Sequence, residues 1–489
     1  MVCWLKQIRM VLLVAVLLVS TASSVGSAVA ATQAAPPNEI VFWEWFGGTM
    51  GDFFEDEARL FSEAHPGLTV RVEHYPDQRV YNEILGLAFA SGSAPDVFVR
   101  SGSYLQLIID GWIQPLDQWI SDEWLARFPE SARGSFVDGI NAWAGEIYTF
   151  PTYASTYDSV LYVNERLFRS AGLVDLAGQV IVPSTWSDLR DMASVITEAG
   201  DGEYYGFGMG IKEPGDMAWW FTLSGLAGTP GLMMDWREGR YTYGTDPGYA
   251  EVVELFLGMK QDGSIYPYEG TLDSTNRHFF FGQGKFAMFA SGTWAISELS
   301  SRFPEFDEYQ VVSLPVPDDG RKGGLGIVPG GGTGLYFMSS QAEQPGNAWL
   351  WLEWISSRAF HKRMVSAGMN FSIYTDLNTR ENIPTARMAQ AYEAITGYAT
   401  IIPFPASLNP MTLLVRPETS APDIGELLAG IYTGQVPQWQ EALLDLEMRK
   451  QTAFEAAIEQ AQERGEVSVD DFVFADWNPM EDYLNRPEE

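Results

Sequence analysis

Three apolar strands decide the fold, and they occur as IVFW (40–43), LTVRVE (68–73) and DVFV (96–99). The stretches between them, 52–64 and 80–91, are predicted helices, the first with apolar side chains at helical spacing. This alternation of strands and helices favours an α/β fold with a parallel sheet covered on both faces. Ligands at such sheets bind beyond the carboxyl ends of the strands, so segments 44–49 and 100–104 are the first candidates for a site.

The alternation of strands and helices continues along the chain. Residues 160–163 and 205–210 are predicted strands, and residues 186–199 and 249–262 are predicted helices. A long amphipathic helix is expected over residues 436–464. With 489 residues, the chain is long enough for two or three domains, each with a core of its own.

The N-terminus has the pattern of a secretory signal peptide. Lys6 and Arg9 precede an apolar run over residues 10–19, and small residues follow up to Ala30. The run is too short to span a bilayer, which needs about twenty residues. We therefore expect residues 1–30 to be removed during export, and residues 31–38 to form a flexible lead. No cysteine follows the apolar run, so a lipid anchor is not expected.

The composition excludes several classes of partner. The formal net charge is −34, from 64 acidic against 30 basic residues, and no basic cluster is present. Because nucleic acids are bound through Lys and Arg, nucleic acid is not an expected partner. The single cysteine, Cys3, lies in the leader, so the mature chain has no disulfide. The four histidines lack the spacing of a metal site, and no cofactor is expected.

Four further segments are informative together. They are SAPDVF (93–98), YTFPTY (148–153) with LYVNERLF (161–168), FFFGQGKFAMF (279–289) with SGTW (291–294), and LPVP (314–317) with GGGTG (330–334). In this order they resemble the bacterial extracellular solute-binding protein family of ABC sugar importers. Together they extend the resemblance over residues 39 to 450. The resemblance implies a periplasmic-binding-protein-like fold of type II, in which two α/β lobes joined by hinge crossings surround a ligand cleft.

The resemblance also implies where the lobes begin and end. Lobe 1 would comprise residues 39–149 and 286–354, and lobe 2 residues 150–285 and 355–489. The crossings would then lie near 149–152, 282–286 and 354–358. Short segments with Pro and small residues suit a hinge, because a few backbone rotations turn a whole lobe.

Aromatic side chains are the main reason to expect a sugar. The chain has 17 Trp, 21 Tyr and 28 Phe, and sugars bind to aromatic platforms surrounded by a few polar groups. The motif Gly292-Thr293-Trp294 resembles the family segment that presents a stacking Trp. Trp45 follows the first strand, where the family has a ligand loop. Arg100 stands where maltose-type members commonly have Trp, which disfavours maltose itself.

The ligand contacts that we predict lie on both lobes. They are Trp294, Trp45, Glu44, Gly47, Arg100, Ser101, Ser103, Tyr153, Trp219, Trp220, Gly292, Tyr374 and Arg416.

Two functions from different classes are open at this point. The resemblance implies a binding protein that delivers a small ligand, most simply a sugar, to the membrane permease subunits of an ABC importer, and we expect it to be monomeric. The alternative is a secreted glycoside hydrolase or lyase, which needs two carboxylates flanking the bond. The 64 acidic residues allow such a pair, whereas no other catalytic motif is present.

Overall fold

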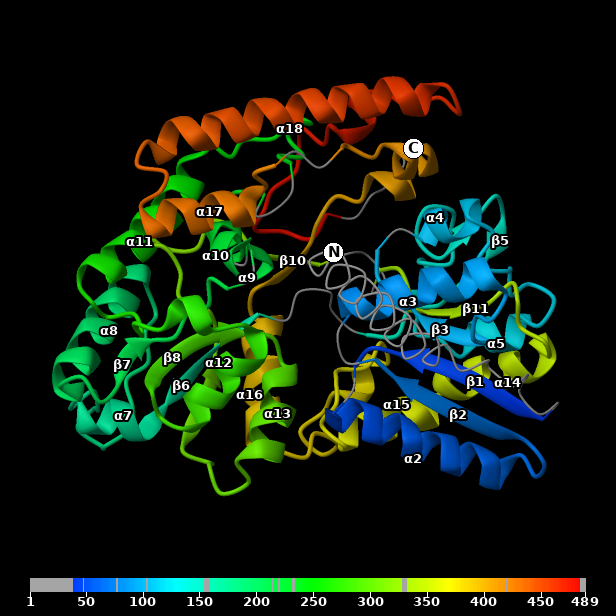
Figure 1. The fold of residues 1–489 in the computed structure, drawn as a ribbon, viewed down its shortest axis with the longest axis horizontal. Coiled ribbons are helices and arrows are strands. Elements are labelled where there is room, and N and C mark those ends of the chain that lie inside the picture. The colour runs from blue at the N-terminus through cyan, green and yellow to red at the C-terminus, as the bar shows by residue number, and fades with distance from the viewer. Residues whose placement is uncertain are drawn as a thin grey trace, which may run out of the picture.

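The structure is a computed structural model. It describes residues 38–46, 48–75, 78–102, 104–153, 159–212, 214–218, 220–230, 234–327, 332–418 and 421–483. Two α/β lobes lie side by side, and a long helix runs along one edge of the molecule (Figure 1).

The first lobe is built on a four-stranded sheet with the order β11-β3-β1-β2. The strands β1 (Glu39–Glu44), β2 (Thr69–His74) and β3 (Val97–Val99) are parallel, and β11 (Tyr336–Met338) is antiparallel to β3. Its helices are α2 (Gly48–Ala64), α3 (Gln78–Ser91), α4 (Tyr104–Ile109), α5 (Asp122–Ala126), α6 (Glu130–Arg133), α14 (Pro345–Ile355) and α15 (Arg358–Ser366). A small hairpin, β4 (Ala142–Trp143) and β5 (Glu146–Ile147), and the 3-10 turn η3 (Thr375–Leu377) complete it.

A buried ion pair joins two helices of this lobe. Glu57 of α2 is 1% exposed, and its two carboxylate oxygens accept from Nε and Nη2 of Arg363 in α15, both at 2.6 Å. Trp354 Nε1 also donates to Glu57 at 2.8 Å. A carboxylate out of contact with water requires such partners, so the pair fixes how α2 packs against α14 and α15.

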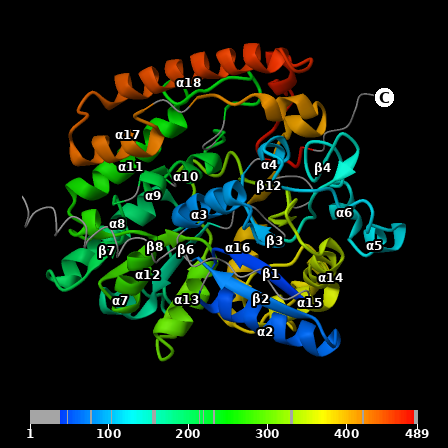
Figure 2. The ribbon, with the colours of Figure 1, turned by 45° about the vertical axis from the view of Figure 1, so that its right-hand side comes forward.

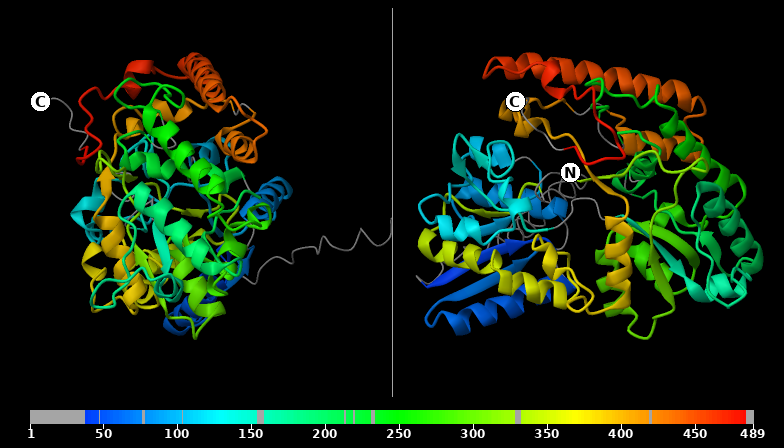
Figure 3. Two further views of the ribbon diagram at one scale, coloured as in Figure 1. Left: turned by 90° about the vertical axis from the view of Figure 1, so that its left-hand side faces the viewer. Right: turned by 180° about the vertical axis from the view of Figure 1, so that it is seen from behind.

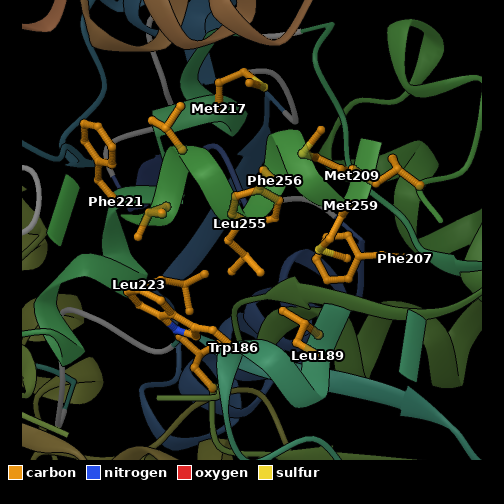
Figure 4. Close-up of a cluster of buried hydrophobic side chains, with 14 of the residues drawn as sticks. Trp186, Leu189, Phe207, Met209, Met217, Phe221, Leu223, Leu255, Phe256 and Met259 are labelled. Carbon is orange, nitrogen blue, oxygen red and sulfur yellow. The ribbon is translucent and has the colours of Figure 1, made fainter. Parts of the chain in front are cut away.

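The second lobe has a mixed sheet with the order β7-β8-β6-β9. Here β6 (Val160–Asn164) is antiparallel to β8 (Phe286–Ser291) and β9 (Tyr309–Val312), while β7 (Tyr205–Phe207) is parallel to β8. The helices are α7 (Glu165–Ser170), α8 (Trp186–Gly200), α9 (Pro214–Ala218), α10 (Trp220–Leu226), α11 (Pro247–Gln261), α12 (Ser274–Gly282), α13 (Trp294–Arg302) and α16 (Ala386–Thr396), with the 3-10 turn η1 (Glu269–Thr271). Figure 4 shows part of the main core of this lobe, where Trp186 and Leu189 of α8 lie near Leu255 of α11.

The C-terminal part forms a layer over one edge of both lobes. The parallel strands β10 (Leu325–Ile327) and β12 (Ala399–Ile401) lead into it, followed by the 3-10 turns η4 (Pro405–Ser407) and η5 (Pro410–Leu414). It continues with α17 (Ile424–Thr433), α18 (Trp439–Gln462) and the 3-10 turn η6 (Val469–Phe472). α17 packs on α9 and α11, and α18 contacts η5. The views in Figure 2 and Figure 3 agree that α18 lies along this edge.

Most predicted elements are confirmed. The three strands of the first lobe, the two helices between them, and the helices that became α8, α11 and α18 all form within three residues of the expected bounds, except that α2 begins at Gly48 rather than Asp52. The strand predicted over 205–210 is shorter, since β7 ends at Phe207.

The expected crossing near Gly282 to Phe286 is wrong. β8 begins at Phe286 and hydrogen bonds to β6 and β7, and β9 pairs with β6, so both strands belong to the second sheet and residues 286–312 to the second lobe. The expected crossing near 354–358 also fails, because Phe360 and Met364 of α15 pack into the core of the first lobe. Apolar strands of the two lobes look alike in sequence, so only the observed strand pairing shows to which lobe each strand belongs.

Candidate ligand-binding site

The predicted residues of the first lobe lie where its parallel strands end. β1 ends at Glu44 and β3 at Val99, so Glu44, Trp45, Arg100 and Ser101 lie at one edge of the sheet, here called the lobe 1 edge. In the second lobe, β8 ends at Ser291 and α13 begins at Trp294; residues 291–294 form the lobe 2 edge. The helices that begin at these two places, α2 and α13, contact each other, which brings the two edges to the same side (Figure 1).

Glu44 is a fully buried carboxylate at the lobe 1 edge, with an exposed fraction of 0%. Its Oε2 accepts a hydrogen bond from the Phe46 amide, and its Oε1 contacts Nδ1 of His74. A buried carboxylate is stable only with such donors. Glu44 therefore fixes the backbone that follows β1, and its oxygens already have partners inside the protein.

Trp45 provides the aromatic surface of the lobe 1 edge. Its half-buried ring packs on Phe46 and on Tyr81, with centroid distances of 5.5 Å in both cases. Tyr81 is itself fixed, because its hydroxyl donates to the Val99 carbonyl at 2.7 Å. The ends of β1 and β3 thus jointly fix the position of the Trp45 ring.

Arg100 and Ser101 supply polar groups beside this ring. The Arg100 amide donates to the Leu335 carbonyl at 2.8 Å, so the backbone is fixed, and the side chain is half-buried. Ser101 is exposed, and its hydroxyl accepts from Gln78 Nε2 at 2.8 Å. Both side chains can hydrogen bond with hydroxyl groups of a ligand.

Trp294 covers Gly292 at the lobe 2 edge. The Trp294 residue is 40% exposed, and a Cβ added at Gly292 would lie 1.9 Å from a carbon of its ring. Tyr162 donates to the Gly292 carbonyl at 2.8 Å. The glycine is therefore required for the tryptophan to lie where it does.

A buried histidine, His278, contacts Ser291 of the lobe 2 edge. His278 is 1% exposed, and its two ring nitrogens contact Ser291 Oγ at 2.9 Å and Glu298 at 2.6 Å. Burial lowers the pKa of His278 despite Glu298. These contacts give it a structural role.

Tyr153 lies at the first crossing between the lobes. Its hydroxyl is 3.0 Å from that of the buried Tyr336, and its backbone pairs with Ser372. Burial raises the pKa of Tyr153 to about 12. The tyrosine pair joins the crossing to β11 of the first lobe.

Two predicted contacts lie elsewhere. Tyr374 is 2% exposed in the core of the first lobe and donates to the Ser356 carbonyl at 3.0 Å, so we no longer include it. Arg416 lies beyond η5 and contacts Gln106 of α4; burial lowers its pKa. It joins the C-terminal layer to the first lobe and lies outside both edges.

Gly47, Ser103 and Trp219 lie outside the described residues, and Trp220 is described only as the first residue of α10. His74 was not among the predicted contacts, although the parallel register of β1 and β2 pairs it with Glu44. The sequence did not give this register, since aligning the predicted strands 40–43 and 68–73 from their first residues would pair Glu44 with Val72.

Within the ranges that the structure describes, no group of three or more His, Cys, Asp or Glu residues could hold a metal ion. Over the same ranges, no helix combines the length and the apolar character that a bilayer crossing requires.

Comparison with known proteins decides the family. The profile described as bacterial extracellular solute-binding protein matches residues 47–360. The chain belongs to this family. A putative binding protein of Brucella abortus is 26% identical to this solute-binding protein over 312 residues, which are 63% of this chain and 70% of that relative. The maltotriose-binding protein of Pyrococcus abyssi is 21% identical over 325 residues, 65% of this chain and 62% of its own.

Solved structures agree on the fold of this solute-binding protein. The GacH receptor of Streptomyces glaucescens, solved unliganded and with acarbose, superposes with a TM-score of 0.65 at 18% identity, over 88% of this chain and 99% of its own. At this identity the likeness establishes the fold alone, and that fold is the predicted periplasmic-binding-protein-like fold of type II.

Proposed function

We propose that this solute-binding protein binds a sugar or an oligosaccharide between its two lobes and releases it unaltered. The observation that carries the proposal is Trp294, which is 40% exposed at the carboxyl end of β8. Indole rings offer an apolar face to the C–H groups of sugars. Trp45 offers a second ring from the other lobe, with Arg100 and Ser101 beside it.

The names of two similar proteins support a carbohydrate ligand. One relative is a maltotriose-binding protein, and one structural neighbour was solved with acarbose. The proposed contacts are Trp294, Trp45, Glu44, Arg100, Ser101, Tyr153 and Gly292, of which Glu44 and Gly292 act by holding the two tryptophans. Gly47, Ser103, Trp219 and Trp220 stay in the proposal on the sequence alone.

In this proposal, the protein acts as a monomer and delivers its ligand to the permease subunits of an ABC importer. The family match supports export, and cleavage after Ala30 remains our prediction for the leader.

The strand pairing supports a revised division of the chain into lobes. Lobe 1 holds residues 39–149 and 336–377, and lobe 2 holds residues 160–312 and 386–396. A ligand that binds the closed state better would shift the lobes toward closure.

The experiment is a thermal-shift and calorimetry panel on the mature chain, with maltotriose and acarbose among a set of mono- and oligosaccharides. A ligand present at a hundred times its dissociation constant stabilises the fold by about 2.7 kcal/mol. We expect one or more members to raise the melting temperature without product formation. Hydrolysis of any member would favour the hydrolase, and no shift with any member would contradict the proposal.

A further inference from the structure

The starting point is the contact between His74 and two carboxylates. His74 is the last residue of β2 and pairs in register with Glu44 at the end of β1. Its Nδ1 contacts Oε1 of the fully buried Glu44, and its Nε2 lies 3.0 Å from Oε1 of Glu55 in α2. A neutral imidazole has a single N–H, whereas the imidazolium has two. Both contacts are hydrogen bonds with ionised carboxylates only when His74 is charged.

The ring is held in place by the helix above it. A Cβ added at Gly51 of α2 would lie 2.9 Å from His74 Nδ1 and 3.3 Å from Glu44 Oε1. No side chain larger than glycine fits there without movement. The imidazole thus packs against α2 at the ends of two strands, with its side chain 28% exposed.

Glu44 transmits this contact to the segment that carries Trp45. One carboxylate oxygen faces His74, and the other accepts from the amide of Phe46, the residue after Trp45. Trp45 and Phe46 pack on each other at 5.5 Å. A shift of the Glu44 carboxylate therefore moves the backbone on both sides of the aromatic ring.

Charged groups face His74 or lie beside it on three elements, β1, α2 and β2. Glu44 on β1 and Glu55 on α2 face its two nitrogens. On β2 itself, the neighbouring Glu73 is engaged by Tyr75 and Arg71. Burial lowers the pKa of His74, but the hydrogen bonds with Glu44 and Glu55 outweigh burial, so the pKa is raised above 6.5.

We propose that His74, in its charged form, is the positioning residue that holds Glu44 and the Trp45 segment in the arrangement that binds ligand. This inference rests on the proposed function and adds regulation by pH to it. Because the pKa is raised in the folded protein, the contribution is complete below pH 6.5 and is lost as pH rises through the folded value.

The test compares the wild-type mature chain, His74→Gln and the matched control His65→Gln, at pH 6 and pH 8.5. His65 is also a partly buried histidine, but its Nδ1 contacts the Phe61 carbonyl at the end of α2, away from the lobe 1 edge. Binding of maltotriose and acarbose is measured by calorimetry. The wild type and His65→Gln should bind about tenfold more weakly at pH 8.5, whereas His74→Gln should bind weakly at both values without pH dependence.

A second measurement does not need a ligand. Hydrogen exchange of the peptide that contains Phe46 gives a protection factor, which should fall from pH 6 to pH 8.5 in the wild type and be low at both values in His74→Gln. If the wild-type protein binds neither sugar at either pH, the proposed function is contradicted. In that case the protection factor of Phe46 still tests whether His74 holds the Trp45 segment. The inference is overturned if His74→Gln has the wild-type melting temperature and also keeps the wild-type pH dependence of affinity or of protection.

Discussion

The two edges each present a tryptophan, but they hold it by different means. At the lobe 1 edge, Trp45 is half-buried against Phe46 and Tyr81, and the backbone around it is fixed by the buried Glu44. At the lobe 2 edge, Trp294 is 40% exposed and lies over Gly292. The first ring is positioned by a polar network and the second by the absence of a side chain. Loss of the polar network at the first edge should therefore cost the most stability, whereas loss of the exposed ring at the second edge should mainly cost affinity.

The largest effect is expected from Glu44→Ala. The change leaves His74 and the Phe46 amide without the carboxylate that they contact. Removing one partner of a buried charged pair typically costs about 3–5 kcal/mol of the free energy of unfolding. Chemical denaturation of the ligand-free protein measures it. The matched control is Glu55→Gln, at the exposed side of the same histidine, which should cost less than about 1 kcal/mol. Equal losses would contradict the comparison.

Gly292→Ala tests the space below Trp294. The added Cβ would lie 1.9 Å from the ring, so the ring must move. Overpacking of this kind costs about 1–3 kcal/mol of stability. Sugar affinity should fall together with stability, as calorimetry and thermal melting on one variant would reveal. The control is Gly215→Ala in α9, where an added Cβ meets nothing within 4 Å. Wild-type affinity in Gly292→Ala would mean that the position of Trp294 does not matter.

Trp294→Ala removes the exposed ring itself. We expect a loss of about 2 kcal/mol in binding, or roughly thirtyfold in affinity, because a stacking surface is lost. The fold should survive, since the side chain is 40% exposed. A buried tryptophan such as Trp351, at 0% exposed, should instead cost about 3–5 kcal/mol of stability when truncated. If Trp294→Ala melts early and binds normally, the residue is part of the core.

Tyr153→Phe should give the smallest effect. It removes one hydroxyl from the pair with Tyr336, whose oxygens are 3.0 Å apart. The loss of one neutral hydrogen bond costs about 1 kcal/mol. Thermal melting detects the change, and small-angle scattering with and without sugar reports whether the lobes still close. A radius of gyration that sugar leaves unchanged in the wild type as well would argue against a closing hinge.

Much of this fold could be predicted from the chain. The strands at 40–43 and 96–99 are mostly apolar and mostly buried, the strand at 68–73 alternates apolar and polar residues, and the helices between them have helical periodicity. The motif at 291–294 was found through its resemblance to the family, whereas the close approach of the Trp294 ring to Gly292 came only from the structure. The buried Tyr374 could not be excluded, since a tyrosine suits a core as well as a binding surface.

By itself, the sequence determined the three strands and two helices that open the first lobe, the helices α8, α11 and α18, the solute-binding family and the two tryptophans of the proposed site. Only the tertiary structure decided that β8 and β9 belong to the second sheet and that His74 meets Glu44. The physical reason is that periodicity is a local property of the chain, whereas strand pairing joins residues far apart in sequence. Glu44 and His74 are 30 positions apart and meet because β1 and β2 pair in parallel.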